Sequence, residues 1–285
     1  MNNFGRKIKI TIGSMHFSNA DLEIRFEVPF DDDYKPNQSR VDILNLSKTT
    51  IAHIKKGTSI NIQAGYGSDV GVLASGKISK VLNKKDGVDK VTSVYMIEGD
   101  DYTEIKVTSK TADPAEKYTK GKKKGQSKKQ AMKISFKAGT DGKTIINRLV
   151  KVLGIKLGAP IKLTRNKVYK KGYVVTGLVQ NNLDEVIRDC GSVMYHRKGK
   201  LIIRPLKQGT DEKFLLEEST GLLESPEAFE EDGVKGYKGK CMLQHRITTA
   251  SIIKIKSKTA NGSYRAKKGK HIADASDFIT EFEIV

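Results

Sequence analysis

Apolar and polar residues alternate with a period of two along much of the first 100 residues. In Lys7-Ile8-Lys9-Ile10-Thr11-Ile12 every second side chain is an isoleucine. This alternation is typical of a strand that buries one face and exposes the other. The pattern predicts strands at 7–12, 22–28, 40–46, 59–66, 70–82 and 91–98. So many short strands in so few residues indicate a small closed or nearly closed barrel.

Two connections in this region carry their own signals. A short helix is predicted after residue 46, because Ser47 can cap its first turn and Gly57 can end it. Ile51 and Ile54 lie on one face of that helix. The last two strands are joined by the turn-rich segment 83–87.

The segment 138–206 is predicted to form a small α+β unit. Residues 140–154 have the spacing of a helix that ends at Gly154. A second helix is predicted at 182–190, with Asn182 as its N-cap and Gly191 after its end. Strands at 192–197 and 200–205 then form a hairpin around the turn Lys198-Gly199.

The last part of the chain returns to the strand pattern. Residues 207–233 are acidic and turn-rich. Strands are predicted at 235–244, 251–257, 263–268 and 278–284. These four strands indicate a second, smaller barrel-like domain. The two β regions share an arrangement of strand, polar connection and glycine turn, although the likeness is too weak to define a repeat.

The fold class predicted from these patterns is mainly β with a small α+β insertion. Two barrel-like β domains are expected in one chain, and the family resemblance described below implies that they assemble as a ring. The expected divisions are a first barrel domain at 1–107, a basic loop or insertion at 108–137, an α+β domain at 138–206 and a second barrel domain at 207–285.

A net charge of +19 favours a polyanionic or acidic partner. Many of the lysines alternate with apolar residues, as on the solvent face of a strand. The basic loop is different, because its lysines cluster in a segment with only Tyr118 and Phe136 for base stacking. The candidate partner-contacting residues are Lys117, Lys120, Lys122, Lys123, Lys124, Lys128 and Lys129.

The residues that usually carry chemistry form no recognisable motif. No GxSxG motif, Walker loop or dinucleotide fingerprint occurs. Counting from Asp31, a calcium loop would need Gly at 36 and Glu at 42, where the chain has Pro36 and Asp42. The scattered candidates are His16, His53, His196, His245, His271, Cys190 and Cys241. We therefore expect no catalytic, cofactor-binding or metal-binding residues, and no enzymatic activity.

No segment resembles a membrane anchor or an export signal. Charged residues interrupt every apolar run well before the roughly 20 residues needed to cross a bilayer. The first residues lack the apolar core of a secretory signal.

Two stretches resemble a known family. The first contains Arg40–Ser47, Thr50, Gly57, Ile60–Tyr66 and Gly76–Ile78. The second contains Gly236–Leu243, Ser251–Ser257, Gly262–Ala266 and Gly269–His271. They are similar to the first and last barrels of baseplate hub proteins from contractile phage tails and phage-tail-like bacteriocins. These hubs are related to the hub portion of type VI secretion spike proteins.

The resemblance implies a structural role without a cofactor. It implies a homotrimer whose six alike domains join a sixfold tail tube to a threefold cell-puncturing spike. The implied partners are the tail tube, spike, tape-measure and baseplate wedge proteins, with nucleic acid only as passing cargo. The implied location is the baseplate of a virion or bacteriocin tail, after synthesis in the host cytoplasm. Any spike or peptidoglycan hydrolase is expected to be a separate polypeptide.

Two other functions stay open. The basic loop and the net charge are compatible with a nucleic-acid-binding protein, whose affinity would fall steeply with salt. A tail-associated cell-wall hydrolase would need paired acids in a cleft, and no such pair stands out in the sequence.

Overall fold

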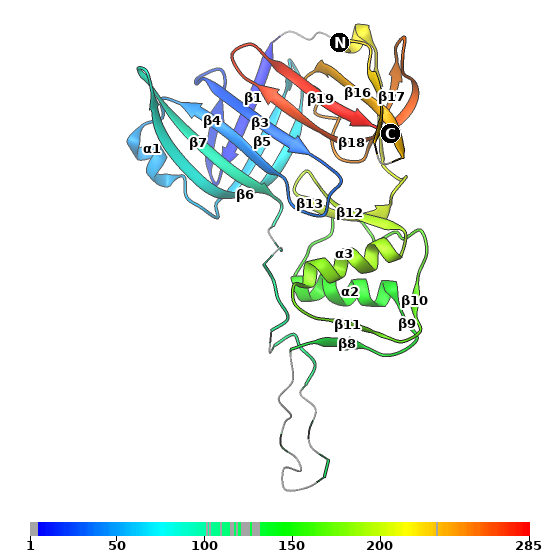
Figure 1. Cartoon of the computed structure of the whole chain (residues 1–285). Helices are drawn as coiled ribbons and strands as arrows, with labels where there is room; N and C mark the ends of the chain where they lie inside the picture. Colours follow the sequence, from blue (N-terminus) through cyan, green and yellow to red (C-terminus); the bar gives the residue numbers. More distant parts are fainter. Residues whose placement is uncertain are drawn as a thin grey trace. The chain divides into compact units, whose positions relative to one another are not determined.

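The computed structural model is mainly β and divides into two compact units. It describes residues 5–100, 102, 104–108, 110–114, 117, 119–120, 126, 132–231 and 233–285. Unit 1 comprises Met1–Asp101, Tyr195–Ile202 and Lys207–Val285. Unit 2 comprises Tyr102–Met194 and Ile203–Leu206. The residues predicted to form two separate β domains thus belong to one unit (Figure 1).

The first half of unit 1 contains all six strands expected from the alternating pattern and one short strand, at Met15–Ser18, that was not expected. These strands are β1 (Arg6–Ile12), β2 (Met15–Ser18), β3 (Ile24–Phe30), β4 (Gln38–Leu44), β5 (Ser59–Tyr66), β6 (Asp69–Asp86) and β7 (Asp89–Glu98). Helix α1 (Lys48–His53) begins after Ser47, whose side chain accepts a hydrogen bond from Thr50 N. The predicted turn at 83–87 is wrong in position, because β6 continues to Asp86.

The second half of unit 1 contains more strands than predicted. They are β14 (Thr210–Leu216), β15 (Glu227–Glu231), β16 (Val234–Met242), β17 (Ser251–Lys256), β18 (Asn261–Ala273) and β19 (Phe278–Ile284), with the 3-10 turn η1 (Glu218–Thr220). Segment 207–233 was expected to be turn-rich, yet it holds β14 and β15. Both strands are rich in charge, which hides the period-two signal.

The two halves form one continuous sheet. The strand order is β15-β16-β19-β18-β3-β4-β7-β6-β5-β1-β2, with β17 beside β18 and β14 beside β17. Strand β18 pairs antiparallel with β3 over Gly269–Ala273 and Phe26–Phe30, which joins the halves. The main path ends at β2 and β15, so among the described residues no barrel closes. The two expected barrels are thus two halves of an open sheet.

The same strand order occurs in both halves. In the first half the order is β3-β4-β7-β6-β5-β1, and in the second it is β15-β16-β19-β18-β17-β14. The strands at equivalent positions follow one another in the same order along the chain, so that β3, β4, β5, β6 and β7 correspond to β15, β16, β17, β18 and β19. One difference is that β14 runs parallel to β17, whereas β1 runs antiparallel to β5.

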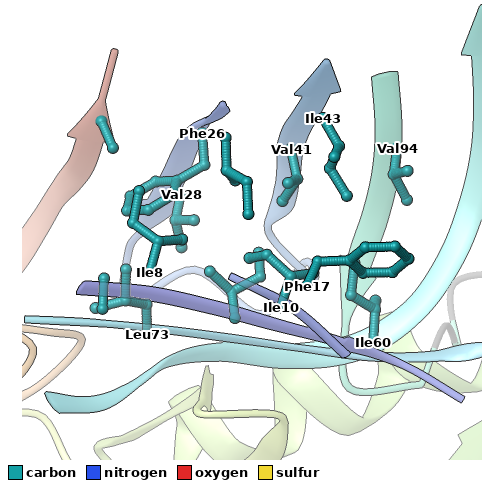
Figure 2. Packing of buried hydrophobic residues seen from close by; sticks show 14 of the residues in the cluster. Ile8, Ile10, Phe17, Phe26, Val28, Val41, Ile43, Ile60, Leu73 and Val94 are labelled. Carbon is teal, nitrogen blue, oxygen red and sulfur yellow. The ribbon is translucent and has the colours of Figure 1, made fainter. Parts of the chain in front are cut away.

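Each half encloses its own apolar core. Alternate side chains of the first half point inward, and Figure 2 shows Phe26, Val41 and Val94 facing Ile8 and Ile10. The second core contains Phe214, Ile253, Ile255, Phe282 and Ile284. Burial of each such side chain contributes roughly 1.5–3 kcal/mol. The alternation of apolar and polar residues visible in the sequence places these side chains on the inner faces of the strands.

Unit 2 combines two helices with short strand pairs. Helices α2 (Gly142–Leu153) and α3 (Val179–Asp189) lie side by side (Figure 1) and bury Ile146, Leu149 and Ile187. The strand pairs are β8 (Ile134–Phe136) with β11 (Tyr173–Val175), and β9 (Thr140–Asp141) with β10 (Val168–Tyr169). Strands β12 (Ser192–Arg197) and β13 (Lys200–Pro205) form the predicted hairpin, whose tip counts with unit 1.

One predicted helix boundary is correct and one is wrong. Helix α2 ends at Gly154, which has the left-handed conformation of a C-cap. Helix α3 begins at Val179 instead of after Asn182. The Asn182 amide lies within the helix, where it donates hydrogen bonds to the carbonyls of Thr176 and Leu178.

Candidate assembly surface

The outer face of β16, β19 and β18 carries a ladder of alternating charge. Glu283 of β19 lies between Lys238 of β16 and Lys268 of β18, at nitrogen–oxygen distances of 3.4 and 3.2 Å. The next outward residue of β19, Glu281, lies between Lys240 and Lys270 at 3.5 and 3.8 Å. Opposite charges on neighbouring strands contribute roughly 0.2–1 kcal/mol each, and water screens these half-exposed pairs. We call these six residues the charge ladder.

A groove of about 590 Å³ crosses the charge ladder. Two strand glycines make room for aromatic rings that are buried in the second core, beneath the charged face. A Cβ on Gly269 would lie 2.6 Å from the Phe30 ring, and one on Gly239 would lie 2.8 Å from the Phe282 ring. Glycine at these two strand positions therefore reflects close packing rather than a turn.

Two further ion pairs hold the halves of unit 1 together. Arg265 of β18 donates to Asp32, in the loop between β3 and β4, at 2.7 Å. Asp69 of β6 accepts from Arg246 at 2.7 and 2.8 Å and lies 3.0 Å from His245 Nε2. The Arg246 hydrogen bonds lower the pKa of Asp69 to about 2. The Asp31-Asp32-Asp33 turn thus contributes a structural ion pair.

The tip of the β12–β13 hairpin adds a buried polar contact to each half. Gly199 N donates to the Glu98 carboxylate of β7 at 3.0 Å. Arg197 donates to the Thr249 carbonyl and pairs with Glu212 of β14. Both Glu98 and Arg197 are buried. Burial raises the pKa of Glu98 to about 7, since desolvation disfavours the charged form.

The structure describes only part of the predicted partner-contacting segment. Lys117 and Lys120 are exposed residues of unit 2. Lys122, Lys123, Lys124, Lys128 and Lys129 lie outside the described residues. The charge ladder and the hairpin-tip contacts were missed in the sequence, because contacts between residues that are distant in the sequence leave no local pattern. The glycines at 239 and 269, inside predicted strands, were a partial signal of close packing at this surface.

The described residues contain no group of three histidine, cysteine, aspartate or glutamate side chains placed to hold a metal ion. Cys190 and Cys241 are both buried and free. Burial also lowers the pKa of His271 to about 3, and its Nδ1 lies 2.8 Å from Thr280 Oγ1. Within the described part of the chain, no helix is long and apolar enough to cross a membrane.

Solved structures of tail proteins share this fold, although no family model matches the chain and no curated protein matches its sequence. The 43 kDa tail protein of prophage MuSo2 from Shewanella oneidensis aligns with a TM-score of 0.60 at 9% identity, over 99% of this chain and 98% of that one. A tail protein from Neisseria meningitidis MC58 gives 0.59 at 9% identity, over 99% and 96%.

A third similar structure belongs to a secretion system. The E. coli c3393 protein aligns with a TM-score of 0.57 at 8% identity, over 97% of this chain and 76% of that one. It is described as a component of the type VI secretion system with structural similarity to the T4 tail proteins gp27 and gp5. The chain therefore shares the fold of these phage tail proteins and of this type VI secretion component, in agreement with the resemblance found in its sequence.

Proposed function

We propose that the chain is a structural hub protein of a contractile tail baseplate. It acts as a homotrimer that joins a sixfold tail tube to a threefold spike. The observation that supports this most is the repeated strand order within one continuous sheet. Three copies would present six alike half-sheets to the tube while keeping threefold symmetry toward the spike.

The site geometry supports the proposal of an assembly protein rather than an enzyme. Buried charged groups of unit 1 make structural contacts: Arg265 pairs with Asp32 between the two halves, and Arg197 of the hairpin tip pairs with Glu212 of the second half. The charge ladder is a set of four lysines and two glutamates that pair with one another across neighbouring strands. We infer a location in the tail baseplate of a virion or bacteriocin and no chemistry or cofactor of its own.

We also propose that the basic segment contacts an acidic partner such as a tape-measure or wedge protein. Lys117 and Lys120 are exposed and carry charge to the surface. A nucleic-acid partner is the competing function. The two are separable, because phosphate binding weakens far more steeply with salt than a mixed protein interface.

The test is the stoichiometry of reconstituted complexes. The purified chain is mixed separately with the tube protein and the spike protein of the same tail, and each complex is weighed by native mass spectrometry. The proposal expects three chains with three spike subunits, and three chains with six tube subunits. Binding to neither protein, together with tight binding to DNA, would replace the hub with the nucleic-acid function.

A further inference from the structure

Several strand edges in unit 1 lack a ladder partner among the described residues, those of β2 and β14 included, and two of them lie on β6 and β15. Strand β6 pairs with β5 only over Asp69–Lys77, and beyond Ile78 that side of the strand is open. Strand β15 pairs with β16 alone. We call Ser79–Asp86 the basic edge and Glu227–Glu231 the acidic edge. Open edges present unpaired N–H and C=O groups that can template a further strand.

These edges occupy equivalent places in the repeated strand order. Strand β18 has the same position as β6, and β3 has the same position as β15. The first part of β18, Asn261–Arg265, pairs with β17, and its later part, Gly269–Ala273, pairs with β3. Strand β6 is built alike, with a paired first part followed by the open basic edge. The pairing of β18 with β3 inside the chain therefore has the geometry that a pairing of β6 with β15 between two chains would need.

The charges of the two edges are complementary. The basic edge carries Lys80, Lys84 and Lys85 against one acid, Asp86. The acidic edge carries Glu227, Glu230 and Glu231 and has no basic residue. The pairing of β18 with β3 inside the chain also places a basic residue beside an acidic one, since Lys270 of β18 lies 4.0 Å from Glu27 of β3.

An apolar residue lies within the basic edge. Leu82 is 42% exposed, which is unusual for a large apolar side chain in the middle of a strand. The acidic edge has one aromatic residue, Phe229, which is half-buried. A strand laid along the basic edge would cover part of Leu82.

We propose that the basic edge of one copy pairs antiparallel with the acidic edge of the next copy, so that copies join head to tail through a continuous sheet. Such a contact uses two different surfaces and therefore closes into a ring when its rotation allows. The closure at three copies rests on the proposed function. The strand pairing itself rests on the shared strand order, the open edges and their charge.

Charge exchange tests the pairing. One variant carries Lys80→Glu, Lys84→Glu and Lys85→Glu, a second carries Glu227→Lys, Glu230→Lys and Glu231→Lys, and a third carries all six changes. Like charges on facing strands should weaken self-association about tenfold or more in each of the first two. The variant that carries all six changes should regain self-association, because opposite charges again face one another. The matched control, Lys7→Glu with Lys9→Glu on β1, should associate as the unchanged chain does.

Disulfide trapping gives a second measurement. Leu82→Cys combined with Phe229→Cys should yield chains linked to one another on oxidation, since Cys190 and Cys241 are buried. The control pair is Leu82→Cys with Val168→Cys, which places the second thiol at an exposed site of unit 2. Equal trapping in both pairs, or no trapping in either, overturns the edge pairing. A trimer whose mass none of the charge variants changes would also overturn it, while leaving the proposed function intact.

Discussion

Arg265 and Asp32, 233 residues apart, form an ion pair of 2.7 Å beside the junction between β18 and β3. Their side chains are 5% and 16% exposed, so water screens this pair much less than a surface pair. The pair shows how the junction between the two halves is secured by charge as well as by strand hydrogen bonds. Replacing one partner alone would leave a buried charge.

Asp32→Asn should therefore destabilise the fold strongly. Loss of one partner of a buried pair costs about 3–5 kcal/mol, because the remaining arginine stays desolvated without its counter-charge. The free energy of unfolding in urea measures this. The control is Asp100→Asn, whose pair with Lys77 is half-exposed and should change stability by about 0.5 kcal/mol or less. A similar small effect for both variants would contradict the role of the buried pair.

Glu98 should make the protein less stable as the pH rises. Its pKa is about 7 in the folded chain and about 4.5 when unfolded. Between these values the unfolded chain releases its proton first, so the free energy of unfolding falls, by about 3 kcal/mol in total, and stays lower above pH 7. Below pH 4.5 both states hold the proton and the penalty is absent.

The comparison of the unchanged chain with Glu98→Gln isolates this effect. Glutamine keeps an oxygen that can accept the hydrogen bond from Gly199 N, and its side chain does not titrate. We expect the difference in stability between the two proteins to shift by about 2.5 kcal/mol toward the variant between pH 5 and pH 8. Parallel stability curves across this range would show that Glu98 does not titrate as described.

Gly199→Ala should weaken the hairpin tip. Gly199 has φ of 81°, and a Cβ there would lie 2.6 Å from the Ser75 carbonyl oxygen. Gly87 has a similar φ of 62° with open space around it, so Gly87→Ala reports the cost of the backbone conformation alone, about 1–2 kcal/mol. The Gly199 variant should lose more than this in thermal unfolding. Equal losses would mean that the backbone near Ser75 moves aside freely.

Neutralising the basic segment should affect partner binding but not the oligomer. We expect Lys-to-Gln changes at 117, 120, 122, 123, 124, 128 and 129 to weaken binding to an acidic tail protein about tenfold at low salt, with an unchanged mass in light scattering. The control replaces Lys7, Lys9, Lys55 and Lys56 by Gln. Unchanged binding in the first variant, or equal loss in both, would remove the segment from the interface.

Local patterns in the sequence predicted much of the fold. The alternating strands, the α1 cap at Ser47 and the end of α2 at Gly154 were all found as expected. Strand β15 was missed because its Glu-Ala-Phe-Glu-Glu sequence has no apolar alternation, and its position depends on pairing with β16.

The assembly surface was harder to predict than the strands. The pairing of β18 with β3 joins residues about 240 apart, so its register is set by tertiary packing rather than by local propensity. The expectation of two separate barrels failed for the same reason. Lysines that looked like a solvated strand face at 268 and 270 prove to be ordered by Glu281 and Glu283 between the strands.

The most direct test of the proposed hub is the mass of the nuclease-treated chain in solution, measured by light scattering at low and high salt. We expect a mass of three chains of 31.6 kDa each that persists at high salt, because backbone pairing and apolar contacts between sheets are poorly screened. A mass of one chain at both salt concentrations, unchanged when the spike protein is added, would contradict the trimeric hub.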